Sequence, residues 1–93
     1  MYVKNVNGTS SRSCKCGTWI EHWRNYSNQT ATVCRAKGCT RKDIVGAHVI
    51  KTYAYDNKEY IVPFCKHHNK QTGSIELVVG TVLTPANKNG TCG

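Results

Sequence analysis

Cysteine and histidine residues spaced like the ligands of a metal ion constrain the fold of this chain more than any other feature. Cys34 and Cys39 are separated by four residues, and Cys65 and His68 by two. Zinc takes four nitrogen or sulfur donors in a tetrahedron, and two donors spaced this closely reach one ion from a single turn. We therefore predict a zinc site formed by Cys34, Cys39, Cys65 and His68, with the first pair on a knuckle that Gly38 allows to bend tightly.

His67 is a second candidate for the fourth ligand, because a cysteine and a histidine two positions apart can also chelate an ion. On a helix, residues three apart share a face and residues two apart do not. The segment that begins at Cys65 has a helical pattern, which favours His68 over His67.

The small size of the chain makes a metal staple valuable. Its 93 residues form one domain, 1–93. A domain this short buries only about 60–65% of the surface that its unfolded form exposes. A structural zinc ion supplies on the order of 10 kcal/mol of folding free energy, which offsets a thin core.

The cysteines could instead form disulfides, since six is an even number. However, the chain opens with the polar segment 1–5 rather than with an apolar secretory signal, and histidines are spaced against the cysteines. Thiols stay reduced in the cytosol. We therefore expect zinc rather than disulfides, and a reducing, cytoplasmic compartment.

A second metal site is a further prediction, because Cys14, Cys16 and Cys92 remain outside the first one. With His22 they would complete a second tetrahedral site that joins the two chain ends, so that the chain would bind one or two zinc ions. The step from Cys14 to Cys16 is tighter than the usual ligand spacing. The alternatives are that His22 packs in the core beside the two tryptophans and that the cysteines are free.

The charge of the chain points to a polyanionic partner. Thirteen basic and five acidic residues give a net charge of +8. Such a surplus suits a nucleic acid, DNA more than RNA, although a basic surface with no partner is the alternative. No stretch approaches the ~20 apolar residues of a membrane span. The predicted phosphate contacts are the basic residues close in sequence to the zinc ligands: Arg35, Lys37, Arg41, Lys42, Lys66 and Lys70.

Local signals predict a small α+β domain, with a β-hairpin followed by a helix and a short helix before the hairpin. Thr18 and Glu21 form a capping box, and an aromatic face at helical spacing follows them. The hairpin strands are expected within 44–49 and 60–64, with Pro63 closing the second because it cannot donate to a ladder. A helix is expected over 65–72, capped by Gly73. Short strands are expected over 31–33, over 75–79 and, as an edge strand, at the N-terminus.

Residues 34–73 resemble the zinc-braced HNH endonucleases, whose ββα-metal core is a hairpin followed by a helix. In that family a cysteine pair precedes a strand carrying Asp-His-Ile or a similar triplet, and a helix then opens with Leu-Cys-x-x-Cys-His-Asn. Here Cys34 and Cys39 match the pair, 46–49 (Gly-Ala-His-Val) match the triplet, and 63–69 (Pro-Phe-Cys-Lys-His-His-Asn) match the helix opening. Small basic chains of this kind occur in phage and prokaryotes, which implies a prokaryotic or phage setting.

The resemblance implies a catalytic site for phosphodiester hydrolysis. His48 would be the general base that activates water, since an imidazole accepts a proton near neutral pH. Asn69 takes the place of the final metal-ligating histidine, and Asn57 is the nearest candidate for the family's middle asparagine. A Mg²⁺ or Mn²⁺ ion at this place would polarise the phosphoryl oxygen and stabilise the leaving group.

One position departs from the family pattern. Ala47 stands where the family usually carries a metal-binding aspartate, and a hard cation such as Mg²⁺ prefers carboxylate oxygen. A catalytic ion would then need a carboxylate from elsewhere, and the candidates are Asp43, Asp56 and Glu59. The alternative role for His48 is a strand histidine that packs on the zinc site or binds zinc itself.

Three functions follow from these features. The first is a small HNH-like nuclease that uses His48 as its base. The second is a binding module, in which the same zinc-braced core presents lysine and arginine to phosphates without cutting. The third is a zinc-stapled protein-interaction domain with Trp19, Trp23 or Tyr53 as anchors, although aromatic residues in so small a domain are more often part of the core.

Overall fold

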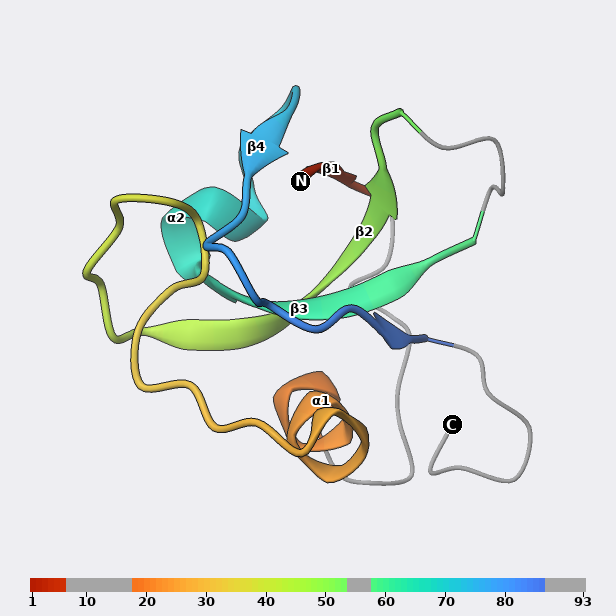
Figure 1. Ribbon diagram of the computed structural model, residues 1–93. Coiled ribbons are helices and arrows are strands. Elements are labelled where there is room, and N and C mark those ends of the chain that lie inside the picture. Colours follow the sequence, from red (N-terminus) through yellow and green to blue (C-terminus); the bar gives the residue numbers. More distant parts are fainter. Residues whose placement is uncertain (7–17, 54–57, 87–93) are drawn as a thin grey trace.

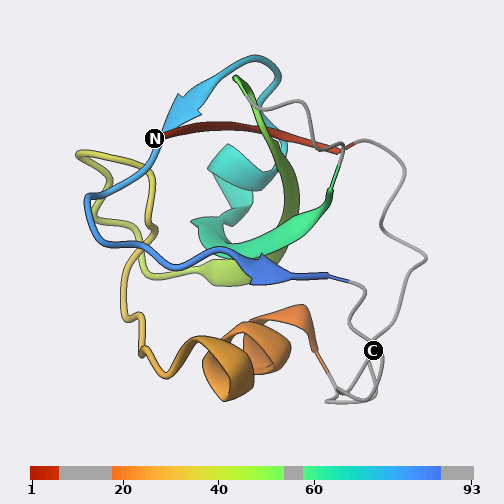
Figure 2. The same ribbon diagram turned by 45° about the vertical axis from the view of Figure 1, so that its right-hand side comes forward.

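An antiparallel sheet with a helix on each face forms the body of the chain (Figures 1 and 2). The computed structural model describes residues 1–6, 18–53 and 58–86. In chain order the elements are β1 (Tyr2–Asn5), α1 (Trp19–Ser27), β2 (Ile44–Lys51), β3 (Tyr60–Cys65), α2 (Lys66–Asn69), β4 (Ile75–Glu76) and β5 (Thr84–Pro85). The strands lie in the order β4-β1-β2-β3-β5. The fold is mixed α+β, as the sequence predicts.

β2 and β3 pair as an antiparallel hairpin, and α2 begins directly after β3. The register pairs Ile44 with Cys65 and Val49 with Tyr60. The sheet has five strands and is therefore larger than the predicted hairpin, because β1, β4 and β5 extend it on both sides. β1, expected at an edge, lies between β2 and β4, and β5 forms where the sequence predicts no strand. β4 and β5 are each two residues long, so distant neighbours rather than local propensity determine them.

The sheet separates two apolar clusters, because successive residues of a strand point to opposite faces. One cluster lies on the face that carries α2, where Ala47 and Val49 of β2 pack with Phe64 of β3. Its other buried members are Val3, Cys34, Ala36, Val62, Cys65, Ile75 and Leu77. The second cluster lies beneath α1 and consists of Trp23, Ala31, Ile61 and Ala86.

α1 begins where the capping signal predicts it. The Thr18 hydroxyl accepts a hydrogen bond from the backbone N–H of Glu21 at 3.3 Å. Trp23 is fully buried, and its indole N–H donates to the carbonyl of Val82 at 2.8 Å. The helix ends at Asn28, which has the left-handed φ of 57° that an asparagine adopts readily at this position.

Gly46 of β2 allows α1 to lie directly on the sheet. A Cβ atom at this position would approach the backbone carbonyl carbon of Trp19 to 2.4 Å and the backbone nitrogen of Ile20 to 2.5 Å. Backbone atoms cannot move aside as the end of a flexible side chain can. Any larger residue at position 46 therefore has to push the helix away from the sheet.

α2 is shorter than predicted, since it covers 66–69 rather than 65–72. Asn5 of β1 contacts the backbone where the helix ends. Its side-chain amide donates to the carbonyl of His68 at 2.7 Å and to that of Gln71 at 2.9 Å. The His68 carbonyl also accepts from the backbone N–H of Gln71 at 3.1 Å, so Asn5 is its second donor. Gly73, with φ of 86°, lies beyond the helix instead of capping it.

Two further predictions about strands are wrong. Residues 31–33 form no strand, and β3 continues through Pro63 to Cys65 instead of closing there. β5 pairs only with Tyr60 and Ile61. Within the described residues β3 therefore has no further strand on that side at Pro63, and proline is tolerated on such an edge.

Candidate metal centre

The side chains of Cys34, Cys39, Cys65 and His68 converge, and their ligand atoms all lie within 4.8 Å of one another. Cys39 Sγ is 4.0 Å from Cys65 Sγ, while His68 Nδ1 is 3.6 Å from Cys34 Sγ and 3.2 Å from Cys65 Sγ. A tetrahedron with bonds of ~2.3 Å to sulfur and ~2.05 Å to nitrogen has edges of about 3.8 Å between sulfurs and about 3.6 Å from sulfur to nitrogen. The four residues are thus close enough to hold a metal ion.

Two segments distant in sequence bring these ligands together. Cys34 and Cys39 lie on a knuckle in which the Cys39 N–H donates to the carbonyl of Ala36 at 3.0 Å, and Gly38 has a φ of 81°. Cys65 ends β3 and caps α2, where its sulfur accepts from the backbone N–H of His68 at 3.4 Å. His68 is one helical turn later, so that its ring lies above the sulfur of Cys65.

The thiols differ in how readily they ionise. Burial opposes ionisation of Cys65, but the backbone N–H of His68 and the neighbouring Cys34 and Cys39 thiols outweigh it and lower the pKa of Cys65. Burial raises the pKa of Cys34 to about 12. A metal binds thiolates, so an ion entering the site must displace the Cys34 proton, and its affinity must depend on pH.

His68 has the protonation state that a metal requires. Burial, together with the positive charge of the nearby His67 and Arg41, lowers the pKa of His68 below its ordinary value of 6.5. The imidazole is therefore neutral at pH 7 and presents Nδ1 toward the sulfurs. His67 is exposed, in accord with the choice of His68 as the ligand.

The segment after the knuckle contains a salt bridge, and its backbone bonds to the start of α2. Arg41 donates to both carboxylate oxygens of Asp43, from Nε at 3.0 Å and from Nη2 at 2.7 Å. Their hydrogen bonds raise the pKa of Arg41 and lower that of Asp43. The Asp43 carbonyl accepts from the backbone N–H of Lys66 at 3.2 Å, and the Arg41 carbonyl from that of Cys34 at 2.9 Å. The segment 41–43 therefore joins both halves of the ligand set.

Sequence reasoning overlooks two supports of the centre. Arg41 and Asp43 are two positions apart, and their spacing on an extended segment could have suggested a pair. Asn5 holds the carbonyl of the ligand His68 across a separation of 63 residues, and no local pattern signals such a contact.

His48 and Asn69 lie on different faces of the sheet. The His48 ring makes an edge-to-face contact with Trp19 of α1 at a centroid distance of 4.4 Å, and its side chain is 5% exposed. Asn69 is exposed on α2, on the other face (Figure 1). Ala47 points into the cluster on the α2 face and is fully buried. The structure does not bring His48 and Asn69 together, and Asn57 lies outside the described residues.

His22 is buried against α1's own aromatic residues. Its ring contacts those of Trp19 at 5.2 Å and Tyr26 at 5.1 Å, and its Nε2 is 2.9 Å from the carbonyl oxygen of Pro85. This is the packing of a core histidine, one of the two alternatives for this residue. The other predicted ligands of a second metal site, Cys14, Cys16 and Cys92, lie outside the described residues.

Half of the predicted phosphate contacts are engaged within the chain. Lys37 pairs with Glu76 at 3.3 Å, Arg41 with Asp43 at 2.7 Å, and the Arg35 guanidinium lies 5.7 Å from the Trp23 ring centroid. Lys42, Lys66 and Lys70 are exposed and make no ion pair with any other described residue. Lys42 lies in the segment that contacts α2, and Lys66 and Lys70 lie on α2 and at its end.

Comparison with known proteins adds no assignment. No protein-family model, no curated protein and no solved structure matches this chain. Within the described ranges, no helix has the length and apolar character needed to cross a membrane. The function must therefore be inferred from the residues and their geometry.

Proposed function

We propose that this chain is a zinc-braced domain that binds nucleic acid through the basic segments around its metal centre, without cutting the strand. The observation that carries the proposal is a set of three exposed lysines around that centre, none of which forms an ion pair with a described carboxylate. The exposed residues Lys42, Lys66 and Lys70 lie in the segment 41–43 and on or next to α2, beside the candidate metal ligands. The nearby Asp43 carboxylate is already paired with Arg41. An unpaired cationic surface of this kind attracts phosphates.

In this proposal zinc has a structural role. Four protein donors fill a tetrahedral site and leave no open position for water or substrate, as in structural rather than catalytic zinc sites. The donor set of three cysteines and one histidine suits zinc, whose structural sites commonly have this composition. The ion would hold the knuckle against the hairpin and α2, and so would keep the basic segments in one place.

Cleavage is the competing function, suggested by the resemblance to HNH nucleases and by the order hairpin then helix. A single divalent ion cannot easily serve both His48 and Asn69, because the sheet lies between them (Figure 1). The buried Ala47 supplies no carboxylate on the α2 face, and the Asp43 carboxylate pairs with Arg41. Since Mg²⁺ prefers carboxylate ligands, these positions favour binding without hydrolysis.

The test is the affinity of the zinc-loaded chain for a labelled DNA duplex, measured by fluorescence anisotropy over a series of salt concentrations. Neutralising about three phosphates gives a slope of log affinity against log salt of roughly −2.7. In Lys66→Gln/Lys70→Gln the slope should become shallower by about 1.8 and the affinity should fall. The variant Lys4→Gln/Lys58→Gln is the control, because it removes the same formal charge from exposed lysines outside the metal centre.

Two results would contradict the proposal. Equal losses in both double variants would mean that net charge, rather than the surface at the metal centre, determines binding. Nicking of supercoiled plasmid in Mg²⁺ or Mn²⁺ that disappears in a folded His48→Ala variant would establish the nuclease function instead.

A further inference from the structure

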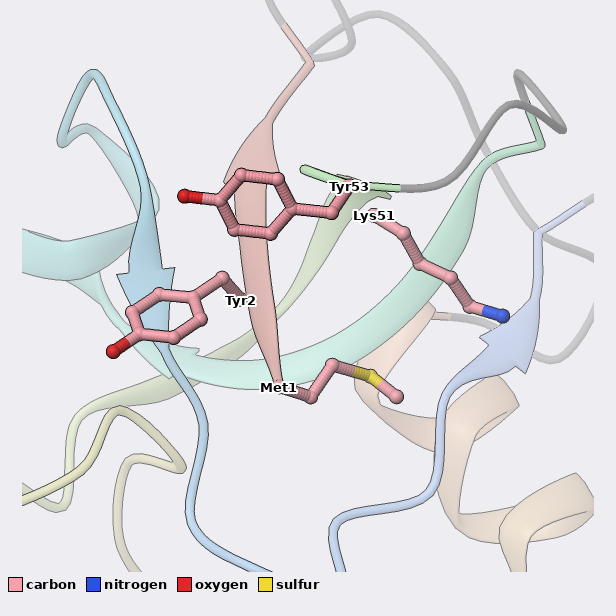
Figure 3. Close-up of a pocket in the computed structure, with 4 residues that line it drawn as sticks. All are labelled: Met1, Tyr2, Lys51 and Tyr53. Carbon is pink, nitrogen blue, oxygen red and sulfur yellow. The ribbon is translucent and has the colours of Figure 1, made fainter.

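A second surface feature lies where β1 begins and β2 ends. An open depression of about 270 Å³ is lined by Met1, Tyr2, Lys51 and Tyr53 (Figure 3). Tyr53 is 82% exposed and Tyr2 is 42% exposed. Two aromatic rings that are not used in the core are therefore placed together on the surface.

The backbone holds the two rings in a fixed relation. β1 pairs with β2, and the backbone N–H of Thr52 donates to the carbonyl of Tyr2 at 3.0 Å. The rings of Tyr2 and Tyr53 lie edge to face, with centroids 6.1 Å apart and an interplanar angle of 80°. The Tyr2 hydroxyl donates to Glu76 at 3.3 Å, which anchors that ring. In Figure 3 the two rings stand beside the depression, with Lys51 on its other side.

The charges around the depression are cationic. Lys51 is the charged side chain among its four lining residues, and its ammonium lies 5.0 Å from the centroid of the Tyr60 ring. Glu76, the carboxylate that the Tyr2 hydroxyl contacts, is paired with Lys37 at 3.3 Å. An aromatic surface with a lysine at its rim matches the two parts of a nucleotide, a flat base and an anionic phosphate.

We infer that the exposed Tyr53 ring is a stacking platform for an unpaired base of a nucleic acid, with Tyr2 supporting that ring edge to face and Lys51 contacting the adjacent phosphate. The inference rests on the proposed nucleic-acid binding and adds the class of ligand, a single-stranded segment. A base inside a duplex has its faces covered by its neighbours, so it cannot stack on a protein ring. Every base has an exposed aromatic face once unpaired, so this contact tolerates any sequence.

The experiment compares a labelled oligothymidylate with a blunt DNA duplex of the same length, using the full zinc-loaded chain. Base–aromatic stacking predicts that Tyr53→Ala weakens single-strand binding by roughly 5-fold or more and leaves duplex binding unchanged. Tyr53→Phe keeps the ring and should bind as the wild type does. Val79→Ala is a control for loss of an exposed apolar side chain elsewhere, because Val79 is 95% exposed.

The outcomes separate this inference from the proposed function. If Tyr53→Ala binds both ligands as the wild type does, the platform is overturned while nucleic-acid binding at the metal centre stands. If the wild type binds neither ligand, both ideas fall, and the exposed rings become a protein-binding surface. A photocrosslink from 5-iodouracil to the peptide containing Tyr53 would support the contact directly, and a crosslink confined to other peptides would overturn it.

Discussion

Loss of one metal ligand should destabilise this chain far more than its small change in volume suggests. The informative substitution is Cys39→Ser, which keeps nearly the same size and removes one thiolate. Cys39 is half-buried, and its sulfur lies 4.0 Å from that of Cys65 in the ligand cluster. The matched control is His67→Ala, which removes an exposed imidazole beside the ligand His68.

The magnitude follows from the four-donor geometry. Structural zinc supplies about 10–16 kcal/mol of apparent free energy in small domains, so an equal share for each of four donors is about 2.5–4 kcal/mol. A domain of this length is stable by only about 5–14 kcal/mol. Cys65→Ala should cost roughly 1 kcal/mol more than Cys39→Ala, because the Cys65 sulfur also caps α2 through the His68 N–H and alanine cannot replace that acceptor.

Thermal unfolding followed by circular dichroism at one fixed free zinc concentration measures this difference, since bound metal shifts the midpoint by mass action. The predicted fall in Tm for Cys39→Ser is roughly 10–30 °C, and for His67→Ala it is close to zero. A Cys39→Ser chain that melts at the wild-type temperature would refute the reasoning. So would a wild-type chain whose Tm is unchanged after a chelator has removed all zinc.

Three further predictions concern the surroundings of the centre. Gly46→Ala should lower the free energy of unfolding by about 2 kcal/mol or more in a urea titration, because its Cβ would lie 2.4 Å from the Trp19 backbone. Thr40→Ala, a substitution at an exposed position, is the control and should change the free energy of unfolding little. Asn5→Ala should cost about 1–2 kcal/mol in the same assay and speed zinc loss to a chelator, because it removes the two bonds that tie the backbone at His68 and Gln71 to β1. If the Asn5→Ala chain lost zinc to the chelator at the wild-type rate, this role of Asn5 would be contradicted. The pKa of His68 is lowered in the folded chain, so the neutral imidazole adds stability above the ordinary pKa of 6.5. This stability should be lost as the pH falls from 6.5 through the folded pKa. The slope of zinc affinity against pH should steepen across this range, because His68 then competes for a proton in addition to the thiols, and a slope that stays the same would contradict a histidine ligand.

Ligand spacing and local capping account for what the sequence predicts well. The spacing of Cys34, Cys39, Cys65 and His68 is sufficient to group them, because each pair lies on one turn and the hairpin returns the second pair to the first. Thr18 and Glu21 locate the start of α1 because capping is a contact between residues three apart. The spacing within each ligand pair and the capping contact are both local, so they can be interpreted without the rest of the fold.

The predictions that depend on distant neighbours are less successful. Ala47 and His48 are adjacent in a strand, so the sequence alone indicates that they point to opposite faces. It does not indicate that α1 covers the face of His48, which the close approach of Trp19 to Gly46 determines. The place of β1 inside the sheet, rather than at its edge, likewise depends on pairing with β2 and β4, whose residues lie far along the chain.

The most direct test of a zinc-braced nucleic-acid-binding domain is duplex affinity measured before zinc removal, after it, and after zinc is restored. If the ion holds the basic segments in place, binding should be lost with the metal and should return when zinc is added back. A zinc-free chain that binds the duplex as tightly as the zinc-loaded chain would contradict the account, because the metal centre would then have no part in forming the surface.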